Sequence, residues 1–258
     1  MREVWPVPGD YAVLAPVYDD IGLGDFAQRM TPVLIDFAQQ RDWLGRRITV
    51  LGCGTGASID YLSQFMFTVT GIDSSPEMLA VAQQKFTEAT NAALHWVQAD
   101  IRELKDRDGT AEMVLALNVL NELNSLRDLE LVFTHVQRML EPEKLFIFDL
   151  ITIQGLSEQG HSTDGVIVNN DRLTAFNTNQ FDYERQMAVS QYILFRRQGD
   201  AWQRSQGQRV LRGFPVQAVA SLVQRAGLKV SGIFQLNLTP YDPGVSQAAR
   251  VIFLAEKP

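Results

Sequence analysis

The stretch "ITVLGCGTGAS", residues 48 to 58, decides the fold of this chain. Its first half is an apolar, β-branched run that predicts a buried strand, and its second half places Gly52, Gly54 and Gly56 before a helical pattern. Glycines in a strand-to-helix loop let the backbone turn sharply and approach a ligand closely, and the start of the helix offers N–H groups to an anion. The spacing alone also fits a tight turn without a ligand and, through Ala57, the loop of dinucleotide binders.

The chain around this loop alternates between helical patterns and short apolar runs, from about residue 28 to residue 150. Such alternation predicts a parallel sheet covered on both faces, with its ligand at the carboxyl ends of the strands. Ser75, Pro76 and Glu77 predict the start of a helix, and "LEPEK" (140–144) predicts a tight helix-to-strand turn. The predicted fold class is α/β: a doubly wound, Rossmann-like, mostly parallel seven-stranded sheet.

A change of pattern marks residues 155–212, where polar and apolar residues alternate without a helical face. Turn residues at 169–171 and 198–200 separate strand-like runs, so we expect an antiparallel β insertion after the fifth strand. Residues 1–154 and 213–258 then form the core. Near the end of the chain, "PVQAVASLVQRAGL" predicts a helix, and "KVSGIFQLNL" and "ARVIFLAEK" predict a closing antiparallel pair of strands. An insertion at this point emerges beside the ligand edge and is placed to act as a lid.

Two acids follow the next predicted strands. Asp73 stands twenty-one residues beyond Gly52, where a carboxylate reaches the two hydroxyls of a ribose, and Asp100 in "QADI" is placed to accept from an adenine amine. As alternatives, Asp73 is a turn residue ahead of Ser75, and Asp100 is an ordinary loop acid. Glycines and acids at three successive strand ends together predict a ribose-containing cofactor.

Composition narrows the classes of partner. The formal charge of 23 − 30 = −7, without a cluster of Lys and Arg, makes nucleic acid an unlikely partner. Cys53 is the single cysteine and the three histidines are scattered, so neither a disulfide nor a metal site is expected. No apolar run has the length of a signal peptide or a membrane span. We expect a cytoplasmic protein without a membrane partner, and the oligomeric state stays open.

Four segments together, "VLGCGTG", "GIDSSPEMLAVA", "VQADI" and "LNVLNELNSLRDLELVFTHVQRMLEPEKLFIFDL", resemble a class I S-adenosylmethionine-dependent methyltransferase of the small-molecule type. The resemblance runs in order from about Tyr11 to Leu150 and continues more faintly through "VQRAGLKV". It implies S-adenosylmethionine as the cofactor. The cofactor-binding residues that it implies are Tyr11, Tyr18, Gly52, Cys53, Gly54, Gly56, Asp73, Ser74, Met78, Asp100, Ile101 and Asn118.

The resemblance also implies which moiety of the cofactor each residue contacts. By the resemblance, the glycines line the methionine and ribose moieties, Asp73 holds the ribose diol, Asp100 with Ile101 holds the adenine, and Asn118 flanks the sulfonium. Tyr11 and Tyr18 lie in an N-terminal segment, "YAVLAPVYDD", of the kind that folds over the cofactor in many small-molecule members; core packing of either tyrosine is the alternative.

One position departs from the family pattern. Val50 stands where family members usually carry an acid. A β-branched residue suits a strand buried on both faces, but the lost charge-assisted hydrogen bond predicts weaker cofactor binding, by about 1.5–3 kcal/mol.

The chemistry requires little from side chains. Methyl transfer from a sulfonium is an in-line displacement, to which positioning contributes up to about 7–11 kcal/mol, so no diagnostic catalytic residue is required. Tyr18 and His161 are the weak catalytic candidates, since each is equally an ordinary packing or loop residue. Candidate substrate contacts in or beside the insertion are Tyr183, Tyr192, Arg209 and Arg212. A lid of antiparallel strands favours a small, enclosed acceptor, and the accepting atom is open among N, O and C.

Two other functions fit parts of the pattern. A nicotinamide-dependent oxidoreductase is favoured by the glycines and Asp73, although the third glycine falls at the wrong spacing. A non-catalytic S-adenosylmethionine-binding protein on the same fold is favoured by Val50 and by the lack of an evident base.

Overall fold

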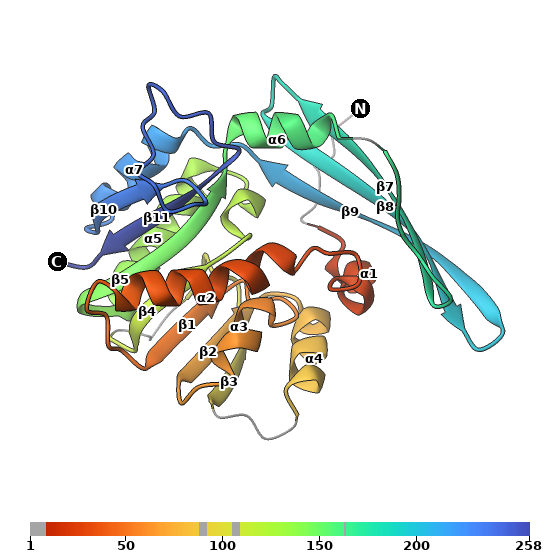
Figure 1. The fold of residues 1–258 in the computed structure, drawn as a ribbon, viewed down its shortest axis with the longest axis horizontal. Coiled ribbons are helices and arrows are strands. Elements are labelled where there is room, and N and C mark those ends of the chain that lie inside the picture. The colour runs from red at the N-terminus through yellow and green to blue at the C-terminus, as the bar shows by residue number, and fades with distance from the viewer. Residues whose placement is uncertain (1–8, 88–91, 105–108, 163) are drawn as a thin grey trace.

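A computed structural model describes residues 9–87, 92–104, 109–162 and 164–258. Residues 1–8, part of the N-terminus in which the sequence shows no signal-like run, lie outside the described residues. The described chain forms two sheets (Figure 1), and the larger has seven strands in the order β10-β11-β5-β4-β1-β2-β3. Its strands are β1 (Arg47–Leu51), β2 (Thr68–Asp73), β3 (Ala93–Gln98), β4 (Ala111–Ala116), β5 (Leu140–Ile151), β10 (Lys229–Phe234) and β11 (Arg250–Glu256).

The first five of these strands are parallel, and β11 lies antiparallel between β5 and β10. This arrangement confirms the predicted fold class, including the antiparallel closing pair. Because β1 and β4 are neighbours while β2 lies on the other side of β1, the strand order reverses between β1 and β4. In open α/β sheets ligands bind at such a reversal, beyond the carboxyl ends of the strands. The glycine loop follows β1 at this point.

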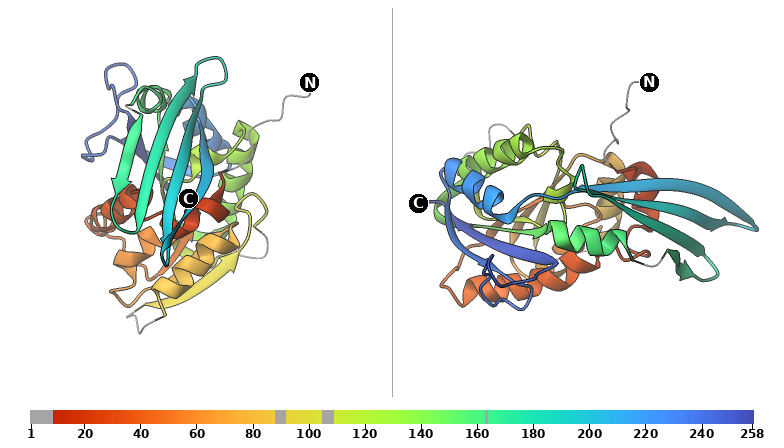
Figure 2. Two further views of the ribbon diagram at one scale, coloured as in Figure 1. Left: turned by 90° about the vertical axis from the view of Figure 1, so that its right-hand side faces the viewer. Right: turned by 90° about the horizontal axis from the view of Figure 1, so that it is seen from above.

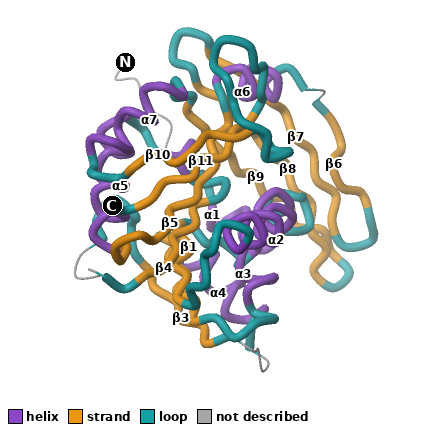
Figure 3. Tube along the Cα trace, turned by 60° about the vertical axis from the view of Figure 1, so that its left-hand side comes forward, coloured by secondary structure: helices purple, strands orange, loops and turns teal. Residues whose placement is uncertain are grey.

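Helices cover both faces of the larger sheet (Figure 3). The face with α2, α3 and α4 packs one apolar cluster, and the face with α5 and α7 packs another. The helical elements are α1 (Tyr11–Leu14), η1 (Ala15–Val17), α2 (Asp25–Gln39), α3 (Ala57–Leu62), α4 (Pro76–Lys85), η2 (Leu120–Glu122), α5 (Leu126–Met139), α6 (Ile153–Gly160) and α7 (Val216–Arg225). The predicted start of α4 is confirmed, since the Ser75 hydroxyl accepts a hydrogen bond from the Met78 N–H at 3.2 Å.

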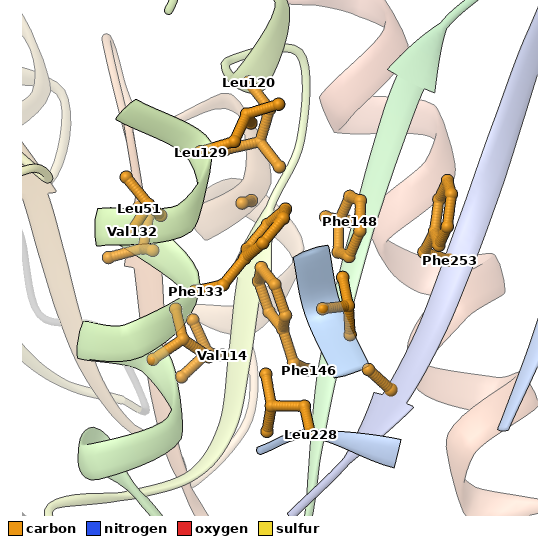
Figure 4. Close-up of a cluster of buried hydrophobic side chains, with 14 of the residues drawn as sticks. Leu51, Val114, Leu120, Leu129, Val132, Phe133, Phe146, Phe148, Leu228 and Phe253 are labelled. Atoms are coloured by element: carbon orange, nitrogen blue, oxygen red, sulfur yellow. The ribbon is translucent and has the colours of Figure 1, made fainter. Parts of the chain in front are cut away.

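The strands contribute alternate residues to these two clusters, as a sheet buried on both faces requires. On the α5 side, aromatic rings of neighbouring strands meet (Figure 4): Phe148 of β5 stacks on Phe253 of β11 with ring centroids 4.5 Å apart. Phe133 of α5 packs on Phe146 with its ring centroid at 6.0 Å. The core therefore fixes β5, β11 and α5 together, and with them the edge of the sheet that carries the loops.

The smaller sheet is antiparallel, in the order β6-β7-β8-β9, and extends from one end of the body (Figure 2). Its strands are β6 (Gly165–Asn169), β7 (Leu173–Asp182), β8 (Met187–Gln198) and β9 (Ala201–Arg212). One face of this sheet packs against the N-terminal segment and α4, through a cluster that joins Tyr192 and Leu194 to Leu14, Tyr18 and Met78. The sheet thus lies on the same side of the molecule as the glycine loop.

Three details differ from the sequence predictions. The predicted insertion begins with a helix, α6, because Thr152 caps it through a 3.0 Å hydrogen bond from the Gly155 N–H and Leu156 is buried. The turn predicted at 140–144 is absent, since α5 ends at Met139 and β5 begins at once. Strand β10 ends at Phe234, short of the predicted Leu238. Among the described helices, none combines the length and the apolar character that a membrane crossing requires.

Candidate active site

A cavity lies at the carboxyl edge of the larger sheet, beyond β1, β2 and β4. Apart from Gly56, every predicted cofactor residue lines it: Tyr11, Tyr18, Gly52, Cys53, Gly54, Asp73, Ser74, Met78, Asp100, Ile101 and Asn118. The predicted cofactor residues thus lie together at one cavity, which is also lined by residues that the sequence analysis did not select, among them Arg102 and Glu122.

The glycine loop is built by backbone conformations that disfavour side chains. Gly52 has φ of +59°, and a Cβ added there meets Val119 Cγ2 at 2.3 Å. Gly56 has φ of +85° at the start of α3, and an added Cβ meets the Phe86 ring at 2.5 Å. Gly56 therefore turns the chain and packs on Phe86, away from the cavity that the sequence assigned to it.

Asp73 ends β2 and holds the loop in place. Its Oδ2 accepts a hydrogen bond from the Gly54 N–H at 2.8 Å, and its Oδ1 accepts one from the Ser75 N–H at 2.9 Å. Burial raises the pKa of Asp73, and the N–H groups of Ser75 and Gly54 oppose this rise. Each carboxylate oxygen has lone pairs for more than one donor, so the group keeps capacity for a ligand hydroxyl.

Asp100 is less free than its position in the sequence suggests. Arg102, two residues on, donates from Nε to Oδ1 at 3.0 Å and from Nη2 to Oδ2 at 2.5 Å. These hydrogen bonds lower the pKa of Asp100. Arg102 itself lines the cavity, and the sequence analysis did not select it. A ligand amine that reaches Asp100 must therefore share this carboxylate with a guanidinium.

Asn118 follows β4 in a left-handed conformation, with φ of +64°. Its backbone N–H donates to the buried carboxylate of Asp149, and its Nδ2 donates to the Leu23 carbonyl at 3.1 Å. Arg250 Nη1 in turn donates to Asp149 Oδ2 at 2.8 Å. Burial raises the pKa of Asp149, and the charge of Arg250 opposes the rise. A buried ion pair beneath the sheet edge thus fixes the backbone of Asn118.

The N-terminal segment covers the cavity. The Thr55 hydroxyl in the glycine loop donates to Asp19 Oδ1 at 2.7 Å, which ties this segment to the loop. The rings of Tyr11 and Tyr18 have centroids 6.3 Å apart. Burial raises the pKa of Tyr18 to about 12, so its hydroxyl stays protonated at neutral pH and acts as a hydrogen-bond donor. Tyr18 thus offers the site a neutral phenol.

Glu122, in η2, lines the cavity close to these tyrosines and was missed by the sequence analysis. Its Oε1 accepts hydrogen bonds from Arg209 Nε at 3.0 Å, from Arg209 Nη2 at 2.7 Å and from the Tyr11 hydroxyl. Arg209 comes from β9, is buried, and also donates from Nη2 to the Asn118 carbonyl at 2.8 Å. Arg209, a predicted substrate contact, lies behind Glu122 and holds it.

The remaining candidates lie elsewhere. His161 is exposed at the end of α6, 3.4 Å from the Tyr183 hydroxyl, and neither residue lines the cavity. Tyr192 is buried under the N-terminal segment, and Arg212 contacts Met187 and the Arg185 carbonyl. Within the described chain, no residue of β6–β9 lines the cavity. The cover predicted for the insertion is therefore provided directly by the N-terminal segment, which the smaller sheet supports.

Val50, the departure from the family pattern, is 1% exposed in the apolar cluster on the α2 face. Its β1 position pairs with Gly71 of β2 and Leu115 of β4. Among the described residues that line the cavity Val50 does not appear. The residue therefore serves the core of the sheet.

Comparison with known proteins gives consistent results. Residues 48–143 match the family model described as a methyltransferase domain. The putative methyltransferase YqeM of Bacillus subtilis (strain 168) is 29% identical over 82% of this chain and 84% of its own length.

Solved structures share the fold over nearly the whole chain. An S-adenosylmethionine-dependent methyltransferase from Clostridium acetobutylicum ATCC 824 superposes with a TM-score of 0.78 at 19% identity, covering 96% of this chain and 98% of its own. CalS10 from Micromonospora echinaspora, an amino pentose methyltransferase solved with S-adenosylmethionine bound, gives a TM-score of 0.68 at 16% identity, over 94% of this chain and 97% of its own. Both likenesses establish the fold.

Proposed function

Because the chain is a class I S-adenosylmethionine-dependent methyltransferase, we propose that it methylates a small-molecule acceptor bound at the tyrosine end of its cavity. The observation that carries the proposal is that one cavity is lined both by the glycine loop, Asp73 and Ile101 and by Tyr11, Tyr18 and Glu122. We assign the first group to the cofactor end of the cavity and the second group to the acceptor end. The match to a methyltransferase domain replaces the nicotinamide alternative.

The cofactor end has the donors and acceptors that S-adenosylmethionine requires. We assign the ribose diol to Asp73, which keeps acceptor capacity, and the adenine to the apolar wall of Ile101 with Asp100 at its edge. Gly52 lets backbone approach where a side chain has no room. When bound, the cofactor supplies an electrophilic methyl group on a sulfonium. Asn118, fixed by Asp149, takes the position beside that sulfonium.

The acceptor end favours a small substrate because the N-terminal segment, which lines it, is tied down at two places. The N-terminal segment is tied to the glycine loop through Asp19 and to β9 through Asp10, whose N–H donates to the Gln208 carbonyl at 2.9 Å. An enclosed site holds the nucleophile in line and excludes water, and this positioning supplies much of the rate enhancement. CalS10, which shares the fold, is named for an amino pentose, also a small molecule.

Isothermal titration with S-adenosylmethionine and S-adenosylhomocysteine tests the cofactor half of the proposal. We expect saturable binding of both, weakened about 100-fold by Asp73→Ala. The acceptor half is tested by incubating a cell extract with methyl-labelled S-adenosylmethionine and separating the products by size. Label in the low-molecular-weight fraction supports the proposal, whereas label in protein or nucleic acid contradicts it. Binding of the cofactor without consumption across all fractions favours the non-catalytic alternative.

A further inference from the structure

Glu122 presents a carboxylate oxygen to the cavity without a partner from the protein. All three hydrogen bonds to this side chain end on Oε1. In the part of the chain that the structure describes, no group donates to Oε2. Because Glu122 lines the cavity and 19% of its side chain is exposed, Oε2 is free to accept a charge-assisted hydrogen bond from a ligand.

The orientation of this carboxylate is fixed by residues of two other segments of the chain. Arg209 is buried, with 6% of its side chain exposed, and its guanidinium also reaches the Asn118 carbonyl. Tyr11 donates to the same Oε1. A charge held by converging donors from two other segments is pre-organised, and a pre-organised group loses little conformational entropy when a ligand binds.

The polar groups around Glu122 determine which ligand group fits there. Among the described lining residues, Asp73, Asp100 and Glu122 are acidic, and Arg102, which is paired with Asp100, is basic. A ligand carboxylate or phosphate close to Oε2 meets like charge. A hydroxyl satisfies one acceptor without charge complementarity, whereas a protonated amine supplies both donors and charge.

We propose that Glu122 is a specificity-determining residue, whose Oε2 binds an amine of the methyl acceptor while Arg209 and Tyr11 position it. The inference rests on the proposed function and narrows its substrate class to amine-bearing small molecules. The aromatic walls given by Tyr11 and Tyr18 suit an apolar or ring-shaped body next to that amine.

A charge series tests the inference. The cofactor end is first saturated with S-adenosylhomocysteine, and benzylamine, benzyl alcohol and benzoate are then titrated by ligand-observed NMR at neutral pH. The three probes share one ring and differ in the charge beside it. We expect benzylamine to bind about tenfold more tightly than benzyl alcohol, and benzoate to bind most weakly.

Variants assign the preference to one carboxylate. Glu122→Gln keeps the side-chain shape and removes the charge; we expect it to weaken benzylamine about tenfold while changing the S-adenosylhomocysteine affinity less than about twofold. Glu184→Gln, at an exposed acid in the turn after β7, is the matched control and leaves both affinities unchanged.

The outcomes separate the inference from the proposed function. Equal binding of amine and alcohol to the unaltered protein overturns the inference, as does a preference that survives Glu122→Gln. Neither result touches the methyltransferase assignment. Failure of S-adenosylhomocysteine to bind a folded protein overturns the proposed function and the inference together. The series in the unaltered protein is informative even where the Glu122 variant folds poorly.

Discussion

The two ends of the cavity are built in opposite ways. The cofactor end is formed mainly by backbone groups. The glycine loop turns through positive φ, and the N–H groups of Gly54 and Ser75 donate to the carboxylate of Asp73. At the acceptor end, side chains meet from distant segments. Tyr11 and Glu122 are 111 residues apart, and Glu122 and Arg209 are 87 apart.

This difference matches the two ligands, since the cofactor is shared by the family and the acceptor is not. Backbone groups and one acid suffice for a cofactor that every member of the family uses, so the cofactor end needs few specific side chains. An acceptor differs from one member to the next, and the ion pair of Glu122 with Arg209 provides a site that substitution can retune. Stability should therefore depend more on the buried pair, and cofactor affinity more on the loop and Asp73.

Arg209→Met gives the largest expected effect. It leaves Glu122 and the Asn118 carbonyl without their buried donor, and removing one partner of a buried pair costs about 3–5 kcal/mol of unfolding free energy. Urea denaturation measures the loss. Arg204→Met, at an exposed position of the same strand, is the control and should lose less than about 0.5 kcal/mol. Equal losses would show that the acceptor end is not held by this pair.

Asp73→Ala should give the largest loss of cofactor affinity. The variant removes the acceptor for a ribose diol and frees the Gly54 and Ser75 N–H groups, so we expect the affinity for S-adenosylhomocysteine to fall about 100-fold. Titration calorimetry measures it, with Asp171→Ala in the β6–β7 turn as the control. If Glu122→Gln weakens the cofactor as strongly as Asp73→Ala, the division of the cavity into two ends is wrong.

Tyr18 should make the unfolding free energy depend on pH. Its pKa in the folded protein is about 12, above the ordinary value of 10.0 for tyrosine, because burial disfavours the phenolate. The folded state thus holds the proton more tightly than the unfolded state. The stability that follows is complete below about pH 10 and is lost as pH rises through about 12, with a total of about 3 kcal/mol. The unfolding free energy of Tyr18→Phe should fall less over this range, and an identical fall would contradict the burial of this hydroxyl.

The sequence predicted the cofactor end because its signals are local. A strand, three glycines and an acid twenty-one residues on are read along one segment, whereas Asn118 and Ile101 were selected by the resemblance to the family. Gly56 does not line the cavity, because spacing does not say which glycine faces the ligand and which turns the chain. The side chain of Phe86, thirty residues away, decides that.

Only some residues of the acceptor end were selected from the sequence. The resemblance to the family selected Tyr11 and Tyr18 as residues that fold over the cofactor, and Arg209 was a candidate substrate contact in the insertion, but nothing in the sequence joined them to Glu122. That link depends on how β9 packs beside η2, which is a tertiary result. His161 drew attention for its residue type alone, and the structure leaves it on an exposed helix end. Helix α6 was missed because its eight residues carry too short a periodic pattern.

Val50→Thr gives the smallest effect and tests the departure from the family pattern. The substitution places a hydroxyl in the apolar cluster on the α2 face, away from the cavity, so unfolding free energy should fall by about 1–2 kcal/mol. Because Val50 does not line the cavity, the affinity for S-adenosylhomocysteine should change less than about twofold. Val33→Thr, at an exposed position of α2, controls for the hydroxyl itself. If the affinity for S-adenosylhomocysteine changes markedly while the unfolding free energy does not, the side chain of Val50 contributes to cofactor binding and this prediction is wrong.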